Sequence, residues 1–308
     1  MRITNIMMTD ASVRSINKNM ERLSKAQAQV STQSKIQQPS DDPVVASRAI
    51  RYRSYVARVE QFQENVNNVT SWQKVTDSAL SDLSDTIVQQ LKELVVKAAS
   101  TGTLNSSDLS AIKEEVTQLQ QSAVDALNTT YGGRYVFGGY ATDVAPYSLD
   151  SDNNVLFKGQ LVSDFTDNGE EQAIKANIGY GSAVSINVEG QAVTGTGDSN
   201  LFATFAKVLA GLDSGDGEAL TSCLDDIEAN LDTILAAQAD LGARMNYVSM
   251  VGDRLANDYT TYKEIMSSNE DVDIAAASAE SATAQVVYEA SLSVGVKVMS
   301  KSLLDYLA

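Results

Sequence analysis

The chain has 308 residues, no histidine, one cysteine and three prolines, and its 23 Lys+Arg against 40 Asp+Glu give a formal net charge of −17. The absence of histidine excludes a Ser-His-Asp triad, a Cys-His dyad and an imidazole metal site, and a single cysteine excludes an intramolecular disulfide. The negative charge disfavours a general nucleic-acid binder, because phosphate contacts need a cationic surface. We expect Cys223 to be a small buried residue on a helix.

The first 60 residues differ electrically from the rest, with ten Lys/Arg against five Asp/Glu, whereas residues 61–308 have thirteen against thirty-five. Polar residues interrupt residues 1–20, so the apolar run of a cleaved secretory signal is missing. From residue 13 to residue 30, alternating three- and four-residue steps carry large apolar residues, with the polar Gln27 at one step, which is the pattern of a coiled-coil seam. The stripe consists of Val13, Ile16, Met20, Leu23 and Val30.

A short polar stretch with two prolines follows this first helix. Pro39 is expected to end that helix, while Ser40, Asp41 and Asp42 are typical N-cap residues for the next one. Pro43 suits the first helical turn, where a proline loses no hydrogen bond. We interpret Pro39–Pro43 as an elbow between two domains.

Residues 44–101 contain neither glycine nor proline and are predicted to be one long helix with few breaks. Such a helix would be roughly 87 Å long at 1.5 Å per residue, which favours a coiled coil or an extended bundle. A three-four repeat runs along it and predicts one continuous seam. The seam positions are Val59, Phe62, Val66, Val69, Gln73, Thr76, Leu80, Leu83, Ile87, Gln90 and Leu94. Another helix is expected to begin at Ser106 or Ser107.

The middle of the chain changes character, because fourteen of the 18 glycines lie between Gly132 and Gly217. Short apolar runs at 135–137, 155–157, 173–178 and 183–188, separated by Gly, Asn and Asp, predict a small β-rich module. A second long helical seam then runs from Leu220 to Met266 without a change of phase. The simplest arrangement is a helical hairpin with the β-rich module at its far end and both chain ends together.

The last residues repeat the helical pattern, with a second stripe at Tyr288, Leu292, Val296, Met299, Leu303 and Tyr306. Burial of the two terminal stripes falls short of the entropy cost of ordering about 65 residues. We therefore expect ends that are poorly ordered in a free subunit and that become ordered against other copies; the alternative is that they pack on their own bundle.

The pattern predicts a mainly α fold: a long antiparallel helical bundle, terminal helices that pair as a coiled coil, and a small β module. We predict three domains. They are a terminal assembly domain (1–38 with 274–308), a helical bundle (39–140 with 201–273) and an outer β-rich module (141–200).

Two segments resemble ligand sites only superficially. Residues 150–154 are rich in Asp and Asn but lack the glycine and the glutamate of a calcium loop. Gly195 and Gly197 lack the third glycine of a dinucleotide fingerprint and the lysine of a phosphate loop. The acidic pairs Glu114-Glu115 and Asp225-Asp226 are interpreted as solvated surface. We expect no catalytic residue, no metal site and no cofactor.

Several segments carry a family resemblance. Residues 38–49, QPSDDPVVASRA, resemble the P-S-D-D-P-x-x-A-S signature of the hook–filament junction proteins of the flagellin superfamily. Residues 1–5 are similar to the start of those proteins, and residues 133–140, GRYVFGGY, resemble their G-R-Y-x-F-x-G-Y segment. Residues 241–246 and 270–275 resemble the returning helix and terminal junction that flagellins share. The resemblance covers roughly 1–145 and 200–308; residues 146–200 match nothing.

The resemblance implies a structural protein of the bacterial flagellum, exported through the flagellar type III channel without a cleaved signal and located outside the cell. It also implies a homo-oligomeric ring between the first hook-associated protein and flagellin. An export chaperone would hold the C-terminal helix before export, and neither nucleic acid nor membrane insertion is implied. A short flagellin, forming the filament itself, is the alternative, and a helical-hairpin signalling protein is a more distant one.

Overall fold

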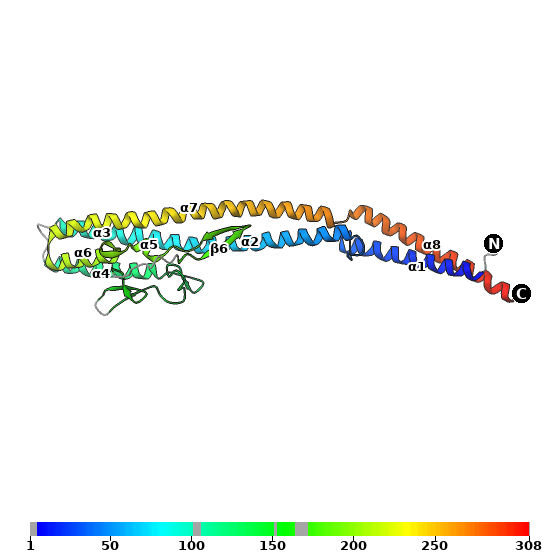
Figure 1. The fold of residues 1–308 in the computed structure, drawn as a ribbon, viewed down its shortest axis with the longest axis horizontal. Coiled ribbons are helices and arrows are strands. Elements are labelled where there is room, and N and C mark those ends of the chain that lie inside the picture. Colours follow the sequence, from blue (N-terminus) through cyan, green and yellow to red (C-terminus); the bar gives the residue numbers. More distant parts are fainter. Residues whose placement is uncertain (1–4, 101–105, 151–152, 164–171, 308) are drawn as a thin grey trace. The chain divides into compact units, whose positions relative to one another are not determined.

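The computed structural model describes residues 5–100, 106–150, 153–163 and 172–307, with side chains between residues 7 and 298. The chain forms two compact units. Unit 1 comprises 1–59 with 257–308, and unit 2 comprises 60–256. The prediction of a mainly α fold with a small β module is confirmed (Figure 1). The division into three domains stays a prediction.

Unit 1 is built around the two ends of the chain. Helices α1 (Asn5–Thr32) and α8 (Ile274–Leu307) lie side by side, as the blue and orange ribbons of Figure 1 show. The first residues of α2 (Pro43–Ser81) and the last residues of α7 (Gly217–Glu270) complete the unit. The predicted coiled-coil pairing of the terminal helices is therefore present.

Unit 2 is a helical bundle with a continuous apolar core. The buried side chains of α7 follow the predicted seam, from Leu220 through Ile234 and Leu241 to Leu255. Cys223 is buried in α7, as expected for a small residue on a helix face. Besides α2 and α7, the bundle contains a π-helix η1 (Asp82–Val88), α3 (Gln89–Ala99), α4 (Ser106–Leu127) and α6 (Leu201–Ser214).

The seam of the first long helix changes phase at η1. A π-helix has a wider turn than an α-helix and so inserts one residue into the repeat. After it the buried positions are Leu91, Leu94, Val95 and Ala98, whereas Gln90 is exposed. The prediction of an unbroken phase through Gln90 was wrong for this reason. The polar seam positions Gln73 and Thr76 are fully buried, as the repeat predicted.

Among the described residues the strands are short and pair only with neighbours in sequence, as β1–β2, β3–β4–β5 and β6–β7, all antiparallel. A short helix α5 (Gly190–Thr194) and a 3-10 turn η2 (Gly197–Ser199) lead back to the bundle. The strands are β1 (Thr130–Tyr131), β2 (Arg134–Tyr135), β3 (Tyr147–Leu149), β4 (Val155–Phe157), β5 (Gln160–Leu161), β6 (Lys175–Gly179) and β7 (Ser182–Ser185).

These strands lie along the side of the helices of unit 2 (Figure 1). The Asn65 side-chain amide of α2 donates a hydrogen bond to the Asn177 carbonyl of β6 (2.8 Å), and Phe62 packs edge-on against Tyr180. Strand residues Tyr147 and Phe157 belong to the same core as the helices. Such short sheets bury too little apolar surface alone, so they need the helical surface beside them.

Candidate assembly site

The terminal helices of unit 1 are connected to α2 and α7 through a small network of backbone bonds. Helix α1 ends at Thr32, where Gln33 adopts a left-handed φ of 58°. Gln33 accepts from the Val272 amide (3.0 Å), and Lys35 donates its amide to the Glu270 carbonyl (2.7 Å). The prediction that Pro39 ends the helix was wrong, because Gln33 and this bridge end it earlier.

The predicted elbow residues have distinct roles. The Asp42 carboxylate accepts from the amides of Val44 (2.9 Å) and Val45 (3.1 Å), so Asp42 is the N-cap of α2 and Pro43 its first residue. This satisfies two of the free amides at a helix start. Ser40 takes no part in the cap; its hydroxyl instead lies 3.4 Å from the side-chain oxygen of Gln38.

Asp41 holds the turn before α2. Its carboxylate accepts from the Lys25 ammonium (2.9 Å) and from the backbone amides of Gln37 (3.1 Å) and Gln38 (3.2 Å). The lysine hydrogen bond, followed by the two amides, lowers the pKa of Asp41 to about 2. The elbow is thus fastened to α1 by one charged contact.

An ion pair fastens the ends of α2 and α7 in unit 1. The Arg53 guanidinium donates through Nε to both carboxylate oxygens of Glu270, at 3.1 and 3.0 Å, and through a second nitrogen as well. Glu270 is 6% exposed, so its charge depends on this partner. The hydrogen bonds that Arg53 donates to the Glu270 carboxylate raise the pKa of Arg53. In addition, the Asn269 amide donates to the Val45 carbonyl (3.2 Å).

The seam between α1 and α8 is lined mostly by small residues. A Cβ added to the buried Gly295 would lie 2.8 Å from Cδ1 of Ile16, so the helices approach closely there. Arg22 bridges the pair to Glu280 (2.6 Å). The covered positions are Thr9, Ser12, Ile16, Asn19, Leu23, Ala26 and Val30 on α1, and Ala277, Ser281, Ala284, Tyr288, Ser291, Gly295 and Val298 on α8.

The predicted stripes coincide with this seam only in part. Ile16, Leu23, Val30 and Tyr288 are in it, whereas Val13, Met20, Leu292 and Val296 are exposed. The prediction placed large side chains along the whole seam. Small side chains, one position away from several of the predicted residues, line it instead and let the helices pack more closely. The missed signal was the seven-residue recurrence of small residues at 277, 284 and 291. The side chains of Met299, Leu303 and Tyr306 lie outside the described residues.

Large apolar side chains therefore cover the outside of the helix pair. Because successive residues of a helix are 100° apart around its axis, the large apolar residues of α8 lie on both sides of the seam and also opposite it. A helix that is apolar all round is normally buried. We call this surface the outer apolar face; it comprises Val13, Met20, Val286, Val287, Leu292, Val294 and Val296. The opposite side of α1 is polar and basic, with Arg14, Lys18 and Lys25 exposed.

No described helix is long and apolar enough to cross a membrane. Within the same residues, no group of three or more Cys, Asp or Glu side chains is placed to hold a metal ion.

Comparison with known families covers both ends of the chain. Residues 3–142 match the bacterial flagellin N-terminal helical region, and residues 224–307 match the bacterial flagellin C-terminal helical region. The chain belongs to the flagellin superfamily. The two matched regions contain α1 and α8, the elbow and both long helices, and the residues between them contain most strands.

Within the flagellin superfamily, two curated relatives match over most of their length. Flagellar hook-associated protein 3 of Escherichia coli K12 is 27% identical over 84% of each chain, and that of Salmonella typhimurium is 24% identical over 87% of each. Flagellin of Escherichia coli K12 is 32% identical, but over only 38% of this chain and 22% of its own.

Solved structures show the same fold. A flagellar hook-associated protein from Vibrio parahaemolyticus has a TM-score of 0.66 at 17% identity, covering 75% of this chain and all of that one. The flagellar junction protein FlgL from Legionella pneumophila has a TM-score of 0.56 at 16% identity, covering 74% and 100%. The prediction of a flagellin-superfamily fold is confirmed.

Proposed function

We propose that this chain is a junction subunit of the bacterial flagellum. A homo-oligomeric ring of such subunits would join the first hook-associated protein on the hook side to the flagellin filament. The observation that supports this best is the match to flagellar hook-associated protein 3 of Escherichia coli K12, which covers 84% of both chains. The role is structural, without catalysis or a cofactor.

The outer apolar face is the surface we assign to assembly. Burying one valine side chain stabilises a contact by about 1.5–3 kcal/mol, so seven exposed apolar residues on a helix pair are a strong reason to associate. Among the described residues, the helices of unit 1 are α1, α8 and the ends of α2 and α7, and they leave this face exposed. Neighbouring copies and the adjacent flagellar proteins would cover it, and Pro39–Pro43 would set the elbow.

Assembly takes place outside the cell in this proposal. The chain would leave through the flagellar export channel without a cleaved signal, with a chaperone holding the C-terminal helix beforehand. Exposed apolar residues on α8, such as Val286 and Val296, would otherwise promote premature association in the cell.

The function is tested by adding purified chain and then flagellin to isolated hooks that lack the junction. We expect the wild-type chain to bind the hooks and to permit filament growth, seen by electron microscopy. Val286→Glu and Val296→Glu should abolish binding while leaving the free subunit as stable as before. Ala11→Glu, which adds the same charge to the polar side of α1, is the matched control. Normal filaments from both valine variants would refute the assignment.

A short flagellin is the second candidate, favoured by the 32% identity over 117 residues to Escherichia coli flagellin. A filament subunit polymerises alone, whereas an adaptor does not. If the purified chain forms long filaments without added flagellin, the junction proposal is wrong.

A further inference from the structure

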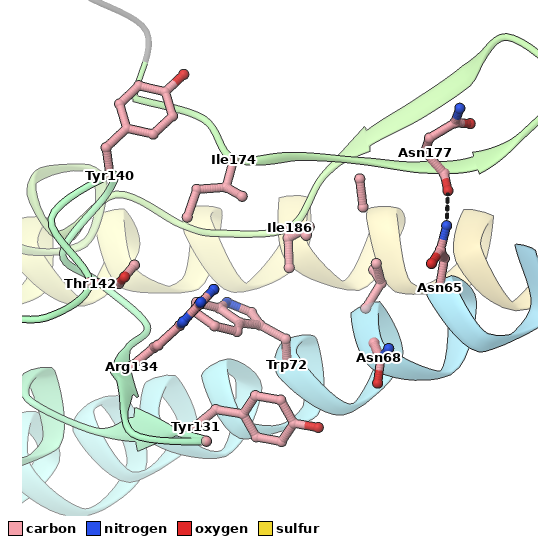
Figure 2. A pocket seen from close by; sticks show the side chains of 13 residues that line it. Asn65, Asn68, Trp72, Tyr131, Arg134, Tyr140, Thr142, Ile174, Asn177 and Ile186 are labelled. Carbon is pink, nitrogen blue, oxygen red and sulfur yellow. Dashed lines mark hydrogen bonds between the residues drawn. The ribbon is translucent and has the colours of Figure 1, made fainter. Parts of the chain in front are cut away.

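A cleft of about 770 Å³ lies inside unit 2. Figure 2 shows it between helix α2, the β1–β2 turn and the β6–β7 hairpin. Its floor is Trp72 of α2, packed edge-on against Tyr131, and its far wall is the chain around Asn177. The size is that of a typical ligand pocket, and the cleft is open on one side.

Two side chains at this cleft have hydrogen-bond donors without an acceptor among the described residues. Trp72 is 9% exposed, and its indole N–H is buried without a partner among the described residues. The Arg134 guanidinium, exposed at the rim, makes no ion pair or hydrogen bond within the same part of the chain. Figure 2 shows the two side chains directed toward each other. A buried donor without an acceptor costs free energy, so an acceptor-rich occupant would be favoured.

The charge of the cleft points to an anion. No carboxylate lines it, and Arg134 is its only formal charge among the lining residues. Arginine binds a carboxylate with two parallel hydrogen bonds, which no other side chain reproduces. A cleft with one arginine and no carboxylate differs from the rest of this region, because residues 61–308 have thirty-five Asp/Glu against thirteen Lys/Arg.

The cleft wall also favours a polypeptide. Strands β6 and β7 pair only with each other among the described residues, so each has one unpaired edge. Unpaired edges offer backbone donors and acceptors to an added chain. Ala176 of β6 and Ile174 before it face the cleft, and the Asn65–Asn177 hydrogen bond holds this segment to α2.

We propose that the cleft receives an aspartate or glutamate side chain from a second copy of this chain, with its carboxylate on Arg134 and a backbone carbonyl or carboxylate oxygen on Trp72. A second copy is the occupant because its residues 61–308 contain thirty-five Asp/Glu against thirteen Lys/Arg, a supply of carboxylates complementary to this cationic cleft. The inference rests on the proposed function, since it assigns one contact between neighbouring subunits.

Cross-linking with a carbodiimide tests the contact, because this reagent couples only an amine to a carboxylate in direct contact. The variant Arg134→Lys keeps the charge and supplies the amine. Isotope-labelled and unlabelled full-length chains are mixed, loaded onto hooks, treated and analysed by mass spectrometry. We expect a cross-link from position 134 to an Asp or Glu of the other isotope. Lys74, an exposed lysine on α2 outside the cleft, is the internal control.

Trp72 supplies a second readout, because it is the only tryptophan of the chain. Its fluorescence emission should shift when the wild type or Arg134→Lys assembles, and should not shift when Arg134→Gln is used. The glutamine keeps a planar polar group at position 134 but removes the charge. We expect about tenfold weaker, less salt-sensitive association of Arg134→Gln.

The results separate this contact from the proposed function. A cross-link at position 134 no stronger than at Lys74, one confined to a single chain, or one to the hook protein or flagellin overturns the inference. If the wild type does not bind hooks at all, the junction proposal fails, and the concentrated free chain is then cross-linked instead. Absence of the intermolecular product there also overturns the inference, whereas its presence supports it.

Discussion

Leu83 in unit 2 and Val296 in unit 1 are both apolar residues on long helices, yet Leu83 is fully buried and Val296 is 67% exposed. Unit 2 surrounds its apolar side chains with its own helices and strands. Unit 1 buries mainly small residues between α1 and α8 and leaves large ones outside. Large apolar residues on an outer surface do not stabilise the free subunit. Their burial stabilises a complex when a partner covers that surface.

Truncation of Leu83 should produce the largest loss of stability. Leu83→Ala removes packed methyl groups from a closed core and should lower the free energy of unfolding by about 2–5 kcal/mol. Val296→Ala should change the free energy of unfolding of the free subunit by less than about 0.5 kcal/mol, because the exposed valine side chain makes few packing contacts. Chemical denaturation followed by circular dichroism measures both. Similar losses for the two variants would remove the contrast between the units.

The close approach of the terminal helices is tested at Gly295. Gly295→Leu should weaken the α1–α8 pair by roughly 1–3 kcal/mol, because Ile16 must move to make room. Faster amide hydrogen exchange in α1 would report this. Gly242→Leu on α7 is the matched control, since nothing lies within 4 Å of an added Cβ there. Equal exchange in wild type and Gly295→Leu would contradict a tight seam.

Loss of the Arg53–Glu270 ion pair should have a smaller effect. Arg53→Met keeps much of the side-chain length but leaves the Glu270 carboxylate, whose side chain is 8% exposed, without its cation. Arg53 itself is largely in solvent, so the cost should be near 1 kcal/mol. Thermal unfolding and hydrogen exchange around Asn269 measure it. The double variant Arg53→Met with Glu270→Met should recover stability; no recovery would mean that the pair does not act as a unit.

Periodicity predicted the helices of this molecule well, because a seven-residue repeat reports the side of a helix that is covered. It predicted the α7 seam throughout and the seam of the first long helical region, from α2 into η1, as far as Ile87. It did not predict η1, since a π-turn depends on how neighbouring helices pack and leaves no strong mark in sequence. Gln90 was misplaced for that reason.

The assembly site was predicted in composition but not in geometry. The sequence indicated large apolar residues on both terminal helices, and of these Val13, Met20, Leu292 and Val296 are exposed. It could not show which stripe faces α1, because large and small residues repeat with the same period one position apart. The cleft escaped prediction, since Trp72, Arg134 and Asn177 are distant in sequence and only the fold brings them together.

Acid should release the elbow before it affects the closed core. The pKa of Asp41 is about 2 in the folded chain against an ordinary 3.8, so the unfolded elbow binds a proton more readily. The contribution of Asp41 is therefore complete above about pH 4 and disappears as the pH falls through about 2. Titration of the Asp41 carboxyl carbon by NMR measures this directly.

The variant Lys25→Met removes the largest cause of that shift and should raise the Asp41 pKa toward 3.8, while the amides of Gln37 and Gln38 keep it somewhat below. The elbow of this variant should loosen at a higher pH than the wild type, whereas Leu83 and its neighbours in unit 2 stay protected. An identical Asp41 titration in both chains would mean that α1 does not hold the elbow through Lys25. The link between the assembly helices and the elbow would then rest on the Gln33–Val272 and Lys35–Glu270 backbone bonds alone.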